Sequence, residues 1–365
     1  MTTRLHRGSD STELTRTGGR TYAGIGLDML SAFGTALGYS RAGIDRMSRD
    51  FSSMLAGWGD LPVGTGPRYL SGVANDHMPI EFSLAWTPDT ANVRALIEPL
   101  GAYPTPRSVQ AEAARLVRAL AVREGVSIGR YLAIEDVFLD REPMSPFSLW
   151  HSVVWGDRTT PMHKVYFNPR VKGDGAAPEL VRRAMTRLGR RKSWRVLETA
   201  FGGFADPRDH PVFFSLDLVG SPDSRVKVYF RHEGMTAAQI DRVDPLMSYG
   251  ERGSLADVCG RVLGHAGPYR KAPITCVTFR GEDGVVDEVT LHLPLSPNLP
   301  NDAVAADRVS ELMRHAGIDD AGYRAALAAG ITRPLERSTA QSWAGFKNAH
   351  QPTVTVYIGP EVYRP

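Results

Sequence analysis

Residues 212–231, VFFSLDLVGSPDSRVKVYFR, decide the fold class of this chain. Two runs rich in β-branched and aromatic residues, Val212–Val219 and Arg225–Arg231, flank the turn-forming sequence Gly-Ser-Pro-Asp-Ser. This pattern predicts a β-hairpin, and hairpins make neighbouring strands antiparallel. A doubly wound parallel sheet is therefore not expected.

The same pattern returns on both sides of this hairpin. Further pairs of strands are predicted at Phe147–Trp155 with His163–Phe167, Ile274–Arg280 with Glu288–Leu293, and Ser342–Lys347 with Val354–Ile358; a single strand, Pro79–Trp86, precedes them. Helical periodicity is clearest at Tyr22–Gly38, Val109–Glu124, Glu179–Leu188 and Ala303–Ala316. The repeated unit is thus helix, hairpin, helix.

A series of hairpins can close on itself, which removes exposed strand edges. We therefore expect an α+β fold, a closed antiparallel β-barrel of about ten strands surrounded by helices. Residues 21–365 would form this one domain, after a flexible N-terminal segment at residues 1–20.

Composition excludes several classes of protein. The chain has 365 residues, of which 42% are hydrophobic and 23% charged, as in globular proteins. Its formal net charge of +3 does not indicate nucleic-acid binding, and the run Arg190-Arg191-Lys192 is interpreted as a solvated helix end. No apolar run is long enough for a membrane span, and Met1–Arg20 lacks the apolar core of a signal peptide, so a cytoplasmic protein is expected.

Alternation within the strands predicts which side chains line the barrel interior. Three strands place polar and aromatic side chains on one face, opposite an aliphatic face: Lys164 with Tyr166, Arg225 with Lys227 and Tyr229, and Thr355 with Tyr357. Helices on the outside would cover the aliphatic faces, so these side chains would point into the lumen. Several buried cations are costly unless they are paired, which predicts a polyanionic ligand. The alternative is a sheet whose polar face is simply solvated.

Five short strings, in this order, resemble the dimethylallyltryptophan synthase family of indole prenyltransferases, in its compact bacterial form. They are Pro79–Ser83, Lys164–Pro169, Arg225–Tyr229, Leu293–Leu295 followed by Asn301-Asp302, and Thr355–Glu361. The resemblance implies a ten-stranded barrel of α-β-β-α units, the ABBA prenyltransferase fold. It also implies dimethylallyl diphosphate and an indole, usually tryptophan, as substrates, with no metal or other cofactor required.

The resemblance also implies roles for individual residues. Glu81 would accept the indole N–H, and with Lys164 it is a candidate catalytic residue. Arg94, Lys164, Arg225 and Lys227 would bind the diphosphate, and Tyr166, Tyr229 and Tyr357 would shield the dimethylallyl cation from water. Where this sequence departs from the fungal motifs, the corresponding candidates are His151, Thr290, His292, Trp343 and Lys347.

The expected reaction is forward prenylation of a benzenoid carbon of L-tryptophan by electrophilic aromatic substitution, in secondary metabolism. Reverse attachment at N1, an indole-containing peptide and another aromatic acceptor remain open, as does a small-molecule binding barrel without catalysis. Metal-dependent prenyl synthase chemistry is not indicated, because Asp319-Asp320 is followed by Ala-Gly-Tyr, so the third acidic residue of an Asp-Asp-x-x-Asp cluster is missing. The partners expected are small molecules, with no nucleic acid or membrane, for a monomer or weak homodimer.

Overall fold

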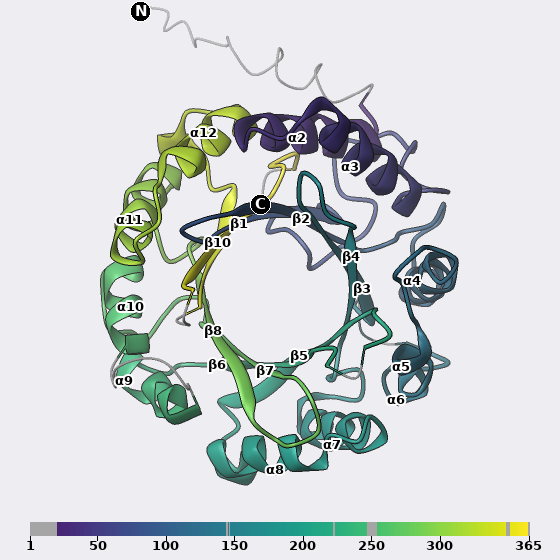
Figure 1. Ribbon diagram of the computed structural model, residues 1–365, viewed down its shortest axis with the longest axis vertical. Coiled ribbons are helices and arrows are strands. Elements are labelled where there is room, and N and C mark those ends of the chain that lie inside the picture. Colours follow the sequence, from purple (N-terminus) through teal and green to yellow (C-terminus); the bar gives the residue numbers. More distant parts are fainter. Residues whose placement is uncertain are drawn as a thin grey trace, which may run out of the picture.

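The computed structural model describes residues 20–143, 145, 147–221, 223–246, 254–347 and 351–363. Ten antiparallel strands close into a barrel in the order β1-β10-β9-β8-β7-β6-β5-β4-β3-β2, and a ring of helices surrounds it (Figure 1). The strands are β1 Ile80–Trp86, β2 Ala91–Ile97, β3 Leu149–Trp155, β4 Met162–Phe167, β5 Asp209–Asp217, β6 Val226–His232, β7 Ile274–Phe279, β8 Val286–Pro294, β9 Gln341–Lys347 and β10 Thr353–Ile358. The expected fold class is confirmed.

The helices follow the chain around the outside of the barrel. They are α2 Tyr22–Ala36, α3 Arg41–Met54, α4 Pro106–Leu120, α5 Gly129–Leu132, α6 Glu135–Phe138, α7 Ala177–Arg187, α8 Arg191–Ala200, α9 Ala237–Ile240, α10 Ser254–Leu263, α11 Asp302–His315 and α12 Ala321–Gly330. Short 3-10 helices lie at Asp174–Ala176, Gly202–Phe204, Asp241–Leu246 and Leu335–Arg337. None of the helices in the described ranges is long and apolar enough to cross a membrane.

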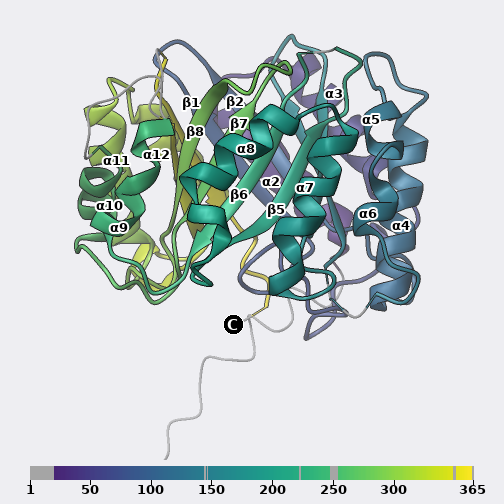
Figure 2. The same ribbon diagram turned by 90° about the horizontal axis from the view of Figure 1, so that it is seen from below.

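The connections give the barrel two different ends. At one end, short turns join β1 to β2, β3 to β4, β5 to β6 and β7 to β8; we call this the hairpin end. At the other, which we call the helix-linked end, the chain leaves the barrel to form helices between one hairpin and the next. Seen from the side, helices such as α7 lie along the outside of strands such as β5 (Figure 2).

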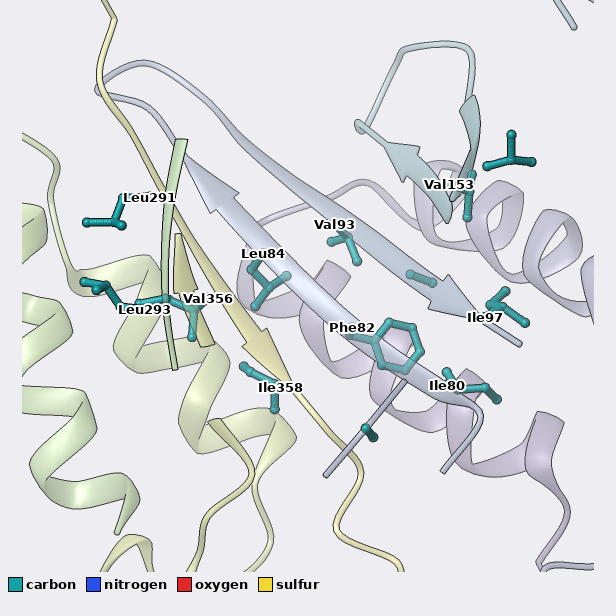
Figure 3. Close-up of a cluster of buried hydrophobic side chains, with 14 of the residues drawn as sticks. Ile80, Phe82, Leu84, Val93, Ile97, Val153, Leu291, Leu293, Val356 and Ile358 are labelled. Atoms are coloured by element: carbon teal, nitrogen blue, oxygen red, sulfur yellow. The ribbon is translucent and has the colours of Figure 1, made fainter. Parts of the chain in front are cut away.

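Apolar side chains fill the space between the barrel and the helices. Phe82 of β1 packs against Phe33 of α2 and Phe51 of α3, with ring centroids 5.8 and 5.7 Å apart. Figure 3 shows Phe82 with the other apolar residues of this layer, which alternate along each strand with residues of the opposite face. The aliphatic face of each strand thus packs outward, as its alternation predicts.

The expected elements agree with the structure to within a few residues, except for those that the sequence analysis did not assign. These are β2, together with helices such as α3, α8, α10 and α12. β2, with the sequence Ala-Asn-Val-Arg-Ala-Leu-Ile, contains two alanines and an asparagine, which have low β-propensity. Hydrogen bonding to both neighbouring strands, β1 and β3, holds this segment in a strand despite its low β-propensity. The segment predicted at residues 1–20 lies outside the described residues except for Arg20.

Candidate active site

A cluster of cations lines the lumen toward the hairpin end. Lys164 lies near the start of β4 and Arg94 in the middle of β2. Arg225 immediately precedes β6, and Lys227 is its second residue. Arg94 donates a hydrogen bond from Nε to the Asn92 side-chain oxygen at 2.8 Å. The charges of Arg225, Lys227 and Arg94 all act on Lys164, so the structure brings together the four residues predicted to bind diphosphate.

Two carboxylates, which the sequence analysis did not identify, lie among these cations. Asp217 accepts a hydrogen bond from Nε of Arg225 at 2.7 Å. Glu288 accepts one from Nζ of Lys347 at 2.8 Å and lies 3.9 Å from Nζ of Lys227. Five cationic side chains thus face two carboxylates, a formal excess of three positive charges that suits a polyanion.

The ionisation of this cluster follows from burial and from its excess of cations. Burial, together with Arg225, Lys227 and Arg94, holds the pKa of the Lys164 ammonium well below its usual value. Burial alone would raise the pKa of Glu288, but Lys227 and Lys347 outweigh it and lower the pKa to about 2. The Glu288 carboxylate is therefore ionised, whereas the charged form of Lys164 is disfavoured by burial and by its cationic neighbours. A bound polyanion would stabilise that charged form.

A belt of aromatic rings lies next to the cations, toward the helix-linked end. Tyr166 and Tyr229 have ring centroids 5.8 Å apart, His292 lies 5.7 Å from Tyr229, and Tyr357 lies 5.8 Å from His292. Burial, with Lys227 and Arg94, lowers the pKa of His292 to about 3, so its imidazole is neutral. We call Tyr166, Tyr229, His292 and Tyr357 the aromatic belt; it joins β4, β6, β8 and β10 across the lumen.

A buried carboxylate, Glu81, lies beyond the belt. It is the second residue of β1 and is 3% exposed. The Ser342 hydroxyl of β9 donates a hydrogen bond to Oε1 of Glu81 at 2.6 Å. Burial raises the pKa of Glu81 to about 7, although Ser342 and Lys271 lower it. Glu81 is thus a hydrogen-bond acceptor held in a fixed orientation in an apolar setting.

Two more cations lie at the helix-linked end. Lys271, in the loop before β7, donates a hydrogen bond to Oδ1 of Asn75 at 3.0 Å, and its Nζ lies 4.5 Å from the centre of the Trp343 ring. Arg231, near the end of β6, shares the lumen-facing alternation of Lys227 and Tyr229. A loop residue such as Lys271 carries no periodic signal, so strand alternation could not have found it.

The five candidates at departures from the fungal motifs divide into two groups. Thr290 and His292 alternate with the outward-facing Leu291 and line the lumen, as do Trp343 and Lys347 on β9. The assignment of His151 is wrong: its Nε2 lies 2.8 Å from the carbonyl oxygen of Ala113 in α4, outside the barrel. Alternation on β3 points Trp150 and Ser152 inward instead.

The sequence and the fold both resemble those of known proteins. Residues 58–257, more than half of the chain, match a family model described as tryptophan dimethylallyltransferase. A structure named 6-dimethylallyl tryptophan synthase shares 27% sequence identity and superposes with a TM-score of 0.89, over 95% of this chain and 98% of that chain.

Two further solved structures resemble the chain over nearly its whole length. A 6-dimethylallyltryptophan synthase from Micromonospora olivasterospora, in complex with DMASPP and Trp, is 27% identical with a TM-score of 0.87, over 95% of this chain and 99% of that chain. A 5-dimethylallyltryptophan synthase from Streptomyces coelicolor is 24% identical with a TM-score of 0.86, over the same shares of the two chains. At that identity the second likeness concerns the fold.

Proposed function

This chain belongs to the tryptophan dimethylallyltransferase family and is a prenyltransferase, and from that premise we propose that it transfers a dimethylallyl group from dimethylallyl diphosphate to free L-tryptophan. The observation that carries this proposal is the order of groups along the lumen. Cations lie toward the hairpin end, the aromatic belt lies next to them, and Glu81 lies beyond. Because the members of this family are enzymes, we no longer consider a small-molecule binding barrel without catalysis.

In the first step, the bond between the allylic carbon and the diphosphate oxygen breaks, and both bonding electrons leave with the diphosphate. Lys164, Lys227, Arg225 and Arg94 would stabilise the charge that develops on the leaving group. The belt would face the dimethylallyl cation and keep water away from it, because aromatic faces attract cations. Because the cationic side chains would stabilise the leaving diphosphate, we include in the proposal that the reaction needs no metal ion.

In the second step, the indole ring attacks the cation to form a carbon–carbon bond, and the ring carbon then loses its proton to a base. Glu81 would accept the indole N–H, which fixes the ring and increases its electron density. Attachment at a benzenoid carbon is our proposal because the 27%-identical relatives are named for attachment at position 6. Reverse attachment at N1 is the alternative product.

Free tryptophan, rather than an indole within a peptide, is supported by the helix-linked end. Burial lowers the pKa of the Lys271 ammonium; Glu81 acts against this effect, and the positive charge of Arg231 adds to it. An acceptor that carries a carboxylate would offset the repulsion between Lys271 and Arg231. A tryptophan within a peptide lacks that carboxylate.

The test is an assay of the purified protein with dimethylallyl diphosphate and L-tryptophan in buffer containing EDTA. We expect a product heavier than tryptophan by one C5H8 unit, and proton NMR of this product should show substitution at a benzenoid carbon. No product with tryptophan or any other indole would contradict the proposed reaction. A product that forms only without EDTA would contradict the metal-independent part alone.

A further inference from the structure

A second carboxylate, Glu98, is buried at the helix-linked end and is not used by the reaction described above. It follows the last residue of β2, and its backbone N–H still bonds to the carbonyl oxygen of Pro79, the residue before β1. Alternation along β2 therefore continues through it and places Glu98 on the lumen side with Arg94 and Leu96. Its side chain is 0% exposed.

Neither carboxylate oxygen of Glu98 has a hydrogen-bond partner in the part of the chain that the structure describes. The Ser71 hydroxyl and the Trp150 indole N–H lie close enough to lower the pKa of Glu98 as donors, but neither forms a hydrogen bond of normal geometry with it. Burial raises the pKa of Glu98 to about 7, and only these two neutral groups act against it. Glu81, by contrast, has both a hydroxyl donor and the charge of Lys271.

An unpaired buried carboxylate costs free energy in the empty protein, and a ligand that brings a cation with N–H donors would remove that cost. The surroundings favour a cation. Trp150, which lies beside Glu98, stacks on Phe147 with ring centroids 3.8 Å apart and lies 5.4 Å from Phe213, so an aromatic cluster adjoins the carboxylate.

We infer that Glu98 binds the α-ammonium group of the acceptor and selects indoles that carry it. This inference rests on the proposed function, in which the acceptor is an indole amino acid. Glu98 would hold the amino-acid part while Glu81 holds the ring, so the two carboxylates fix two different parts of one acceptor. Glu98 acts on affinity for the acceptor and leaves ionisation of the donor unchanged.

The experiment compares L-tryptophan with indole-3-propionic acid, which is tryptophan without its amino group, in the wild-type protein and in Glu98→Gln. We expect Glu98→Gln to raise KM for L-tryptophan roughly 10-fold or more, the loss of a hydrogen bond to a charged group, with kcat nearly unchanged. KM for indole-3-propionic acid should change less than about 2-fold, since that acceptor offers no ammonium. Glu124→Gln, at an exposed position, is the control and should alter neither.

A parallel change of KM for both acceptors would overturn the inference, because a residue that merely orients Trp150 would affect them equally. Calorimetric binding to the wild-type protein gives a second reading that needs no variant and no turnover. L-tryptophan should bind roughly 10-fold or more tightly than indole-3-propionic acid, and equal affinities would also overturn the inference. Failure of the proposed function appears differently, as the absence of prenylated product from every indole.

Discussion

Glu81 shows how one buried residue makes the reaction depend on pH. The carboxylate accepts the indole N–H more strongly than the protonated carboxyl group does, and burial raises the pKa of Glu81 to about 7. We expect kcat/KM to fall as the pH drops below about 7, because the protonated form accumulates. Indole-3-propionic acid is the acceptor to use, since it lacks the ammonium group that Glu98 is inferred to bind.

Two variants test this assignment. Glu81→Gln should lower kcat/KM roughly 10- to 100-fold and abolish the pH-dependent limb, because the amide does not titrate. Ser342→Ala removes the hydroxyl that lowers the pKa of Glu81, so the limb should move to higher pH. A limb that stays in place in Glu81→Gln would assign the titration to another group.

Lys227 is the residue that tests the donor site most simply. Its Nζ lies 3.9 Å from Glu288, and Glu288 keeps a hydrogen bond from Lys347 when Lys227 is changed. Lys227→Met should lower kcat/KM for dimethylallyl diphosphate roughly 100-fold, the typical effect of removing one donor to a developing anion. Lys172→Met, at an exposed position, is the control. Steady-state kinetics with varied donor would refute the assignment if both variants matched the wild-type protein.

At the scale of elements, the aromatic belt joins four strands, and its value lies in excluding water. Tyr229 is its best-connected member, in contact with the rings of Tyr166, Phe213 and His292. Tyr229→Ala should increase the fraction of dimethylallyl alcohol among the products, because water then reaches the cation. Tyr229→Phe keeps the ring and should preserve the partition. Equal alcohol fractions in the two variants, measured by gas chromatography, would argue against shielding by this ring.

The packing of the last helix on the first is a separate test of the fold. A Cβ at Gly330 of α12 would lie 2.3 Å from the ring of Phe33 in α2, whereas one at Gly260 of α10 would have no atom within 4 Å. Gly330→Ala should lower the free energy of unfolding by about 1–3 kcal/mol through overpacking. Gly260→Ala should raise it by roughly 0.5–1 kcal/mol, the usual gain within a helix. Urea unfolding measures both, and equal midpoints would contradict this packing.

Alternation along the strands predicted which side chains face the lumen. Lys164, Tyr166, Lys227 and Tyr229 were placed on one face by sequence alone, and the structure places them in the lumen. Glu288 could have been found in the same way, since it alternates with Thr290 and His292. His151 was misplaced because a register error of one residue reverses every side chain of a strand.

At the scale of the whole molecule, closure of the barrel brings distant parts of the chain together. Glu81 and Ser342 are 261 residues apart in sequence and share a hydrogen bond, because β1 and β9 both flank β10. Lys271 reaches Asn75 from a loop on the other side of the lumen. Such contacts depend on which strands meet when the barrel closes, so no local pattern in the sequence could have predicted them.

The separation of donor and acceptor along the lumen is the central claim, and a crystal structure with an unreactive thiolodiphosphate analogue of the donor and L-tryptophan tests it most directly. We predict the diphosphate among Arg94, Lys164, Arg225 and Lys227, and the indole beyond the aromatic belt with its N–H on Glu81. A diphosphate bound at the helix-linked end, or an indole far from Glu81, would contradict the account.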